Sequence, residues 1–216
     1  MQVGCGVMRL DWRQVIALGT LVVGVALAGA SARASVIGYT SSGGSIDPNE
    51  NFTLGVRFDT NQSIVIDSLG VLDVDGNGLD AAHDVGLWDA SGNSLATATV
   101  LAGTGSALQD GFRFESITPV VLAAGETFTV AAYYGAGPIR DKLFGTTPTA
   151  APVITLKSET WFVSGGSLSF PNLVDSVNFR STAGFTVVPE PTTALLLMAG
   201  LAGLAAGGRR SGRSRA

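Results

Sequence analysis

Residues 51–58 read Asn-Phe-Thr-Leu-Gly-Val-Arg-Phe, and the apolar side chains from Phe52 to Phe58 occupy every second position. Successive side chains of a β-strand point to opposite faces, so this pattern predicts a strand with one buried face. The same alternation returns at Phe128, Val130 and Ala132. A second sheet is needed to cover these apolar faces.

The segment around these strands, residues 35–187, contains many short runs of β-branched and aromatic residues, separated by Gly, Asn, Asp and Pro. It has no sustained helical periodicity, which predicts an all-β fold. The number and spacing of these short runs favour a single β-sandwich, with Greek-key or jelly-roll topology, over a closed barrel. The expected strands are 51–58, 64–72, 84–89, 94–100, 111–115, 119–122, 127–134, 160–163 and 178–187.

The connections carry turn residues. Residues 89–94 and 123–126 are predicted to be hairpin loops, because Gly and Asn adopt the positive φ that such loops need. Residues 135–152 lack alternation and are dense in Gly, Thr, Ala and Pro, which predicts a long surface excursion around Phe144.

The composition limits the function classes. Residues 35–188 contain 15 acidic and six basic side chains. An acidic domain without a basic stripe repels phosphate backbones, so nucleic acid is excluded as a partner, and divalent cations are more natural ligands. Cys5 is the only cysteine of the chain, so no disulfide can form within one chain.

Both ends read as targeting segments. Arg9 and Arg13 precede an apolar run, and Ala32-Arg33-Ala34 supplies small residues for cleavage, which predicts a signal peptide over residues 1–34. The alternative is an uncleaved N-terminal anchor. Export of the domain 35–187 is expected with either interpretation.

The C-terminal tail, residues 188–216, has three parts. Pro189-Glu190-Pro191 keeps the backbone extended and outside a helix. Residues 192–208 are uncharged and just long enough to span a bilayer as a helix, at about 1.5 Å per residue. The basic end, 209–216, opens with Arg209 and Arg210 and would stay in the cytoplasm.

This tail resembles the PEP-CTERM sorting signal of Gram-negative bacteria. The resemblance implies processing near the motif by an exosortase, a membrane cysteine protease-transpeptidase. It also implies transient anchoring in the inner membrane and delivery to the cell surface, often in organisms that make extracellular polysaccharide. The alternative is a simple C-terminal anchor.

A second resemblance lies in the body of the chain, over residues 51–134. The segments that carry it include Leu69-Gly70-Val71, Asp75-Gly76-Asn77-Gly78-Leu79 and His83-Asp84-Val85-Gly86-Leu87-Trp88. They resemble a β-sandwich domain of unknown function that recurs in PEP-CTERM proteins. This resemblance identifies relatives and assigns no catalytic residue.

Residues 73–84 have the spacing of a calcium loop, with oxygen ligands at positions 1, 3 and 5, Gly at 6 and a carboxylate at 12. Position 12 is the shorter Asp, and the flanks read as strands, so the alternative is a loop that caps its own turns. The candidate Ca²⁺ ligands are Asp73, Asp75, Asn77, Leu79 and Asp84.

Enzymatic signals are weak. His83 is the only histidine, and a structural role is favoured over acid–base chemistry with Asp80 or Asp84. The long carboxylates Glu115, Glu126 and Glu159 offer no basis for pairing them as a glycosidase would. No catalytic residue is predicted.

Aromatic side chains offer a different function. Trp161, Tyr133 and Tyr134 would form a saccharide-stacking surface if they were exposed together, whereas Trp88 reads as a core residue. The favoured interpretation is a non-enzymatic cell-surface or matrix protein associated with extracellular polysaccharide. A carbohydrate-binding module with a defined site is the alternative, and a glycan hydrolase is a weaker one.

Overall fold

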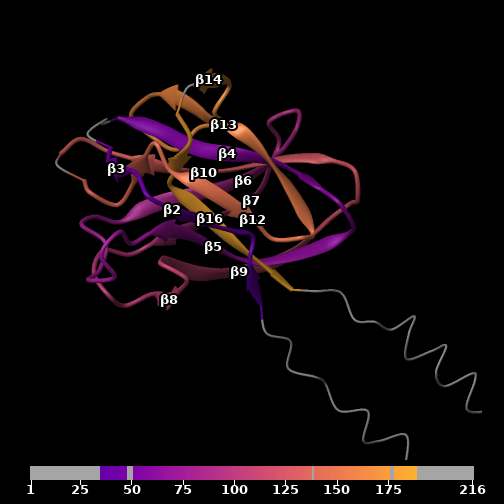
Figure 1. Cartoon of the computed structure of the whole chain (residues 1–216), viewed down its shortest axis with the longest axis horizontal. Helices are drawn as coiled ribbons and strands as arrows, with labels where there is room; N and C mark the ends of the chain where they lie inside the picture. The colour runs from indigo at the N-terminus through magenta and orange to yellow at the C-terminus, as the bar shows by residue number, and fades with distance from the viewer. Residues whose placement is uncertain (1–34, 48–50, 138, 176–177, 189–216) are drawn as a thin grey trace, which may run out of the picture. The chain divides into compact units, whose positions relative to one another are not determined.

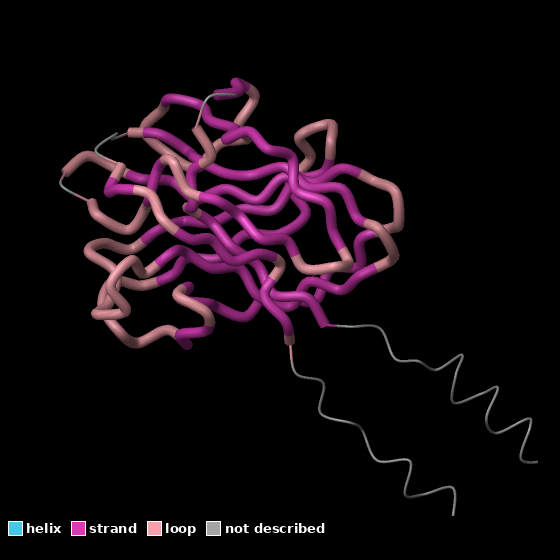
Figure 2. The backbone as a smooth tube through the Cα atoms, in the orientation of Figure 1, coloured by secondary structure: helices cyan, strands magenta, loops and turns pink. Residues whose placement is uncertain are grey.

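The computed structural model describes residues 35–47, 51–137, 139–175 and 178–188. Within these ranges the chain is all β and contains no helix (Figures 1 and 2). The all-β prediction is therefore confirmed. The predicted signal peptide, Pro-Glu-Pro motif, apolar segment and basic end lie outside the described residues. No helix that could cross a membrane occurs in the ranges given above.

Two large antiparallel sheets make up most of the domain, with strands drawn from distant parts of the sequence (Figure 1). The five-stranded sheet has the order β1 (Val36–Ile37), β16 (Ala183–Val188), β5 (Ile64–Leu72), β9 (Phe112–Leu122) and β8 (Ala107–Gln109). The six-stranded sheet has the order β14 (Leu173–Asp175), β13 (Ile154–Ser164), β4 (Phe52–Thr60), β10 (Thr127–Tyr134), β6 (His83–Asp89) and β7 (Ser94–Val100).

Two small sheets lie among the connections. One has the order β15 (Arg180–Ser181), β11 (Leu143–Phe144) and β3 (Ser45–Ile46), and the other pairs β12 (Thr147–Ala150) with β2 (Tyr39–Ser42). Because β2 and β12 are far apart in sequence, the second pairing ties the start of the domain to the segment after residue 146.

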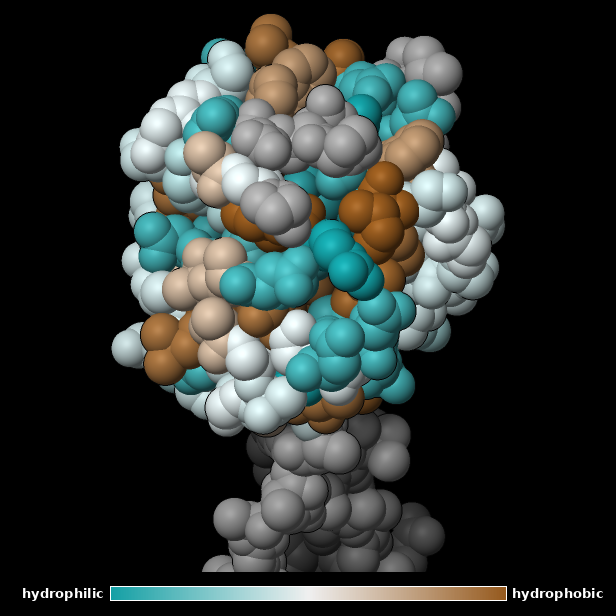
Figure 3. All heavy atoms as spheres, turned by 90° about the vertical axis from the view of Figure 1, so that its left-hand side faces the viewer, coloured by the Kyte–Doolittle hydropathy of each residue, from teal (hydrophilic) through white to brown (hydrophobic). Residues whose placement is uncertain are grey.

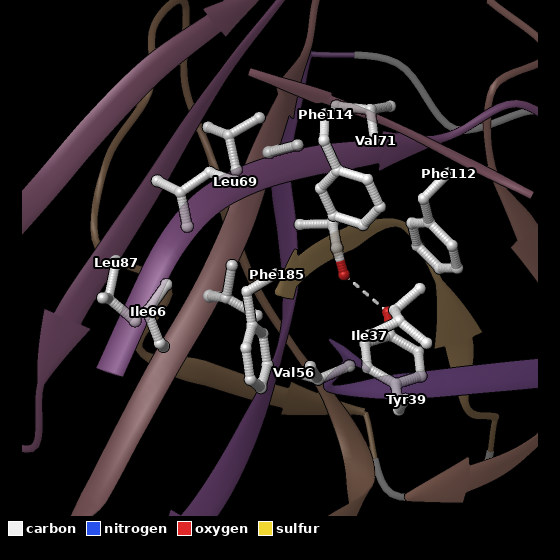
Figure 4. Close-up of a cluster of buried hydrophobic side chains, with 14 of the residues drawn as sticks. Ile37, Tyr39, Val56, Ile66, Leu69, Val71, Leu87, Phe112, Phe114 and Phe185 are labelled. Atoms are coloured by element: carbon white, nitrogen blue, oxygen red, sulfur yellow. Dashed lines mark hydrogen bonds between the residues drawn. The ribbon is translucent and has the colours of Figure 1, made fainter. Parts of the chain in front are cut away.

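One hydrophobic cluster draws on both large sheets. Phe58 of β4 stacks on Phe185 of β16, with ring centroids 4.4 Å apart, so the two sheets are in direct contact. The Tyr39 hydroxyl donates a hydrogen bond to the Ala183 carbonyl at 2.6 Å, which satisfies a fully buried polar atom at the edge of this cluster (Figure 4). The alternation at Leu54, Val56 and Phe58 produces this core, because all three side chains face the other sheet.

The strongly alternating strands were predicted well. Strands β5, β7 and β10 have the predicted bounds, while β4 and β6 differ from them by one or two residues. The predicted strands 111–115 and 119–122 form one strand, β9, and the predicted strand 160–163 is the end of β13. Longer strands were missed where a register shift interrupts the alternation, as it does between Leu156 and Thr160.

Two predictions about connections need correction. Residues 123–126 form a turn, but it joins β9 of one sheet to β10 of the other, so it is not a hairpin loop. The predicted surface excursion 135–152 contains β11 and β12, and its Asp141 and Lys142 are only 3% and 1% exposed. Its Gly and Pro content predicted the irregular backbone but not the burial.

Replacing Phe185 with alanine is expected to destabilise the domain by about 3–5 kcal/mol, because the change removes a fully buried ring and leaves a cavity between the sheets. Guanidinium unfolding followed by tryptophan fluorescence measures this loss. Val121→Ala is the control, since Val121 is 67% exposed and should change stability by less than about 0.5 kcal/mol. Equal stability of the two variants would contradict the assignment of the core.

Candidate functional site

The loop between β5 and β6, residues 73–82, begins with a buried ion pair. The Oδ2 atom of Asp73 accepts hydrogen bonds from Nε of Arg113 at 2.7 Å and from the Gly78 amide at 3.0 Å. Gly78 has φ of +113°, a conformation that a side chain would disfavour, and this lets the loop curl back over Asp73. Arg113 also donates to the carbonyls of Thr104 and Ser106. The Arg113 guanidinium therefore links loop 73–82 to residues 104–106 through hydrogen bonds.

The other predicted calcium ligands point to different places. The Asp75 carboxylate is exposed and lies 3.5 Å from the Arg140 guanidinium. The Leu79 carbonyl accepts a hydrogen bond from the Gly103 amide at 2.8 Å. Asp84 is exposed on β6, and its carboxylate accepts a hydrogen bond from the Thr99 hydroxyl at 2.6 Å. Asn77 is exposed in the same loop as Asp75.

The structure does not gather the carboxylates among the candidate calcium ligands into one group, and calcium binding stays a prediction. In the part of the chain that the structure describes, no group of three or more His, Cys, Asp or Glu side chains is placed to hold a metal ion. Two physical reasons account for this. Arg113 pairs with the Asp73 carboxylate, and Asp84 belongs to β6, where it accepts a hydrogen bond from the Thr99 hydroxyl.

His83 forms a second buried polar pair. Its Nε2 lies 2.8 Å from Oδ2 of Asp141, and its Nδ1 lies 2.9 Å from the Tyr133 carbonyl. A carbonyl can only accept, so the Nδ1–H group of His83 donates to the Tyr133 carbonyl. Asp141 also accepts the Asp80 amide at 2.9 Å. The pair joins β6, β10 and the segment 139–142.

This geometry gives both ring nitrogens of His83 a hydrogen-bond partner. The sequence suggested Asp80 or Asp84 as its carboxylate partner, whereas the partner is Asp141, 58 residues away. No local sequence signal marks this contact, because Asp141 lies in a segment without periodicity. The His83 ring is fully buried and lies 4.7 Å from the Tyr134 ring, so the imidazole itself has no contact with solvent.

Beside these two pairs lies a small polar hollow of about 50 Å³. Its charged lining mixes acidic side chains with one guanidinium, and both buried pairs contribute a carboxylate to it. The hollow is lined by Asp73, Val74, Asp75, Asn77, Asp80, Arg140 and Asp141.

Figure 3 shows the surface on the side where β3 and β8 lie. Hydrophilic, neutral and apolar residues are mixed across this surface.

The three aromatic residues of the predicted saccharide surface do not share one face. Tyr134 is fully buried and its hydroxyl faces the Asp141 carbonyl at 3.4 Å, so it cannot contact a saccharide, and burial raises its pKa well above the usual tyrosine value. Tyr133 and Trp161 are partly exposed, and they pair with Thr53 and Gly55 on the opposite face of the six-stranded sheet.

Trp161 belongs to a cluster that sequence reasoning missed. The Arg57 guanidinium carbon lies 3.3 Å from the centroid of the Trp161 ring and 5.4 Å from that of Phe170, which is a cation–π arrangement. Phe170 in turn lies 6.1 Å from Trp88. Trp88 is therefore buried as predicted, but on the outer face of the sheet.

Two glycines, Gly55 and Gly86, leave room for this outer cluster. A Cβ atom at Gly55 would lie 2.3 Å from that of Ala131, and one at Gly86 would lie 2.3 Å from the Trp88 ring. Glycines inside alternating strands signal such close approach, and they were the available sequence clue. The Trp161 indole nitrogen is buried and has no hydrogen-bond partner among the described residues.

Two family models match the sequence. A domain of unknown function (DUF4082) covers residues 40–181, more than half of the chain. The PEP-CTERM protein-sorting motif covers residues 187–211. Both resemblances drawn from the sequence are confirmed. No curated protein and no solved structure matches the chain.

Arg113→Met is expected to cost about 3–5 kcal/mol of stability, because it leaves the Asp73 charge buried without its partner. Arg140→Met is the matched control, since the Arg140–Asp75 pair is more than half exposed and contributes less than about 1 kcal/mol. Denaturant unfolding measures both values. A similar small loss in both variants would refute the structural role given to Arg113.

Proposed function

This chain belongs to the family of the domain of unknown function DUF4082 and ends in a PEP-CTERM protein-sorting motif, and we propose that it is a non-enzymatic protein of the cell surface or extracellular matrix. The sorting motif is the observation that carries the proposal. It marks an exported protein that an exosortase processes, with a C-terminus anchored in the membrane before delivery to the surface.

The chemistry of the tail supports this route. Pro189 and Pro191 deny the backbone helical hydrogen bonds on both sides of Glu190, so a membrane protease meets an extended segment. The arginines from Arg209 onward favour a cytoplasmic C-terminal end, which leaves the acidic domain on the other side of the membrane. Processing near the motif would then release the domain from residues 192–216.

The use of ionisable side chains supports a role without catalysis. His83 is held by Asp141 and the Tyr133 carbonyl, and the Asp73 carboxylate is held by Arg113. Glu115, one of the long carboxylates considered for glycan hydrolysis, accepts a hydrogen bond from Ser106. These groups stabilise loops, which leaves them poorly placed for proton transfer to a ligand.

For the domain we propose a β-sandwich built from the five-stranded and six-stranded sheets. The Phe58–Phe185 stack and the shared hydrophobic cluster support it. The chain also passes from β4 in one sheet to β5 in the other and back to β6, and it crosses again between β9 and β10. Such crossings between facing sheets are typical of Greek-key sandwiches.

Association with extracellular polysaccharide is the finer part of the proposal. An uncharged polymer of hydroxyl groups is compatible with a domain whose net charge would repel acidic partners. One observation favours the second candidate, a carbohydrate-binding module with a defined site. Tyr133 and Trp161 are both partly exposed on the outer face of the six-stranded sheet, where their rings could contact a sugar beside the Arg57 guanidinium that already covers one face of Trp161.

Replacing both Pro189 and Pro191 with alanine in the producing bacterium is expected to block processing, because the motif then gains helical hydrogen-bond donors. The variant should stay in the membrane fraction with its tail intact, as measured by intact-protein mass spectrometry. Val188→Ala, which keeps the motif, is the control and should be processed like the wild type. Release of the double variant at the wild-type mass would contradict exosortase sorting.

Polysaccharide association predicts that the processed protein stays on cells that make extracellular polysaccharide and appears in the medium of a strain that does not. Immunoblotting of cell and medium fractions measures this partition.

For a defined saccharide site, Trp161→Ala and Tyr133→Ala should abolish binding to the purified polymer, whereas Phe144→Ala, on β11, should not. Equal partition in the two strains would exclude the association, and normal binding by both variants would exclude the site.

A further inference from the structure

Ser35, the residue directly before β1, is held in place from two sides. Its hydroxyl donates a hydrogen bond to Oδ2 of Asp67 on β5 at 2.9 Å. Its carbonyl accepts a hydrogen bond from Nε2 of Gln109 on β8 at 3.2 Å. The next two residues pair with β16. The first residues of a domain are poorly ordered unless such contacts hold them, so Ser35 has a defined position beside Asp67.

The Asp67 carboxylate is partly buried and surrounded by hydroxyl groups. Its Oδ1 atom accepts hydrogen bonds from the Thr186 hydroxyl at 2.6 Å and the Ser68 hydroxyl at 3.3 Å. Its Oδ2 atom accepts a hydrogen bond from Ser35 and from no other described residue. Because each carboxylate oxygen has two lone pairs, Oδ2 has room for a second donor.

No basic side chain neutralises Asp67 within the described ranges, since Asp67 belongs to none of the ion pairs formed there. It is the one ionisable side chain of β5, and strands β1, β7, β8 and β16 have none. Asp110, which follows β8, is exposed. Strands β6 and β9 also pack against β5, but their ionisable side chains have other partners. Arg113 bonds to Asp73, Glu115 to Ser106, His83 to Asp141, Asp84 to Thr99 and Asp89 to Asn93.

The predicted cleavage of the signal peptide supplies a cation at this place. A cut after Ala34 makes Ser35 the first residue of the mature protein. In the uncleaved chain the Ser35 nitrogen belongs to a neutral peptide group with one hydrogen to donate. After the cut it is an α-amino group, whose ordinary pKa of about 7.7–8.0 leaves it mostly charged at neutral pH.

The new ammonium group forms close to the carboxylate. In any serine, the backbone nitrogen lies at most about 3.7 Å from the side-chain oxygen. Because the Ser35 oxygen is 2.9 Å from Oδ2 of Asp67, the ammonium nitrogen forms within about 7 Å of Oδ2. Once released from its peptide bond, this nitrogen turns about the bonds of Ser35 toward the open side of Oδ2.

We propose that Asp67, with the hydroxyls of Ser35, Ser68 and Thr186, is the binding site of the α-ammonium group that signal-peptide cleavage creates at Ser35. This site goes beyond the proposed function and rests only on the predicted cleavage after Ala34. The ion pair links the first residue of the mature protein to β5. Since β1 also pairs with β16, cleavage fastens this two-residue edge strand to the sheet.

An NMR titration of the Ser35 carbon signals in the processed, ¹³C-labelled protein tests the site, after N-terminal sequencing of the same sample. The wild-type α-amino pKa is expected at about 8.5 or above, because a nearby carboxylate favours the charged amine. Asp67→Asn keeps the shape without the charge and should return this pKa to about 7.7–8.0. Asp110→Asn is the matched control at an exposed carboxylate and should leave it raised.

The pH dependence of thermal unfolding provides a second readout. A pKa that is higher in the folded state than in the unfolded state stabilises the fold below about pH 7.7, and this stabilisation is lost as the pH rises through the folded-state pKa. The wild type should therefore melt above Asp67→Asn at pH 7, and the gap should narrow by about 2–4 °C at pH 10. Asp110→Asn should follow the wild type, and circular dichroism establishes that both variants are folded.

Three results would each overturn the proposal. The first is a mature protein whose first residue is not Ser35. The second is a wild-type α-amino pKa within or below the ordinary range, which decides the matter even if Asp67→Asn fails to fold. The third is a raised pKa that Asp67→Asn leaves unchanged, or that Asp110→Asn lowers to the same extent. A protein that binds no polysaccharide leaves all three readouts as they are, so failure of that association is distinguishable from failure of this site.

Discussion

Contact between the apolar faces of the two large sheets is the interaction on which the rest of this domain depends. The chain has one cysteine, at position 5, so no disulfide supports the fold. Stability must therefore come from burial, and the Phe58–Phe185 stack stands at the centre of a cluster that collects side chains from both sheets. Burying an aromatic side chain contributes about 1.5–3 kcal/mol, so a few such contacts equal the net stability of a typical domain.

The polar pairs are secondary to this core but decide the shape of the loops. Asp73–Arg113 and His83–Asp141 are both buried, and each joins segments that are 40 or more residues apart. Such pairs cost desolvation energy, and they hold one conformation because any other leaves a charge unpaired. Two residues that looked reactive in the sequence, Asp73 and His83, are thereby held in buried pairs.

The sequence predicted the features that depend on local periodicity. Strands β5, β7 and β10 could be placed because each alternates or is rich in β-branched residues between turn residues. Strands of two or three residues could not, since two residues carry no period. The contacts of the candidate site residues could not be predicted for a related reason. Spacing along residues 73–84 suggested calcium, but what decides the role of Asp73 is Arg113, which no local pattern connects to it. Likewise, the outer cluster of Trp161, Arg57 and Phe170 depends on a segment folding back over the sheet.

The first and last strands of the domain adjoin the two predicted end segments in the sequence. β16 pairs with β1 on one side and β5 on the other, so the last described strand is an inner strand of the five-stranded sheet. Val36 pairs with Val187, which brings the first and last strands of the domain side by side. β16 ends at Val188, directly before Pro189, and proline has no amide hydrogen to donate to a neighbouring strand. The pairing of β1 with β16 therefore adjoins both predicted end segments in the sequence and is itself made by residues within 35–188.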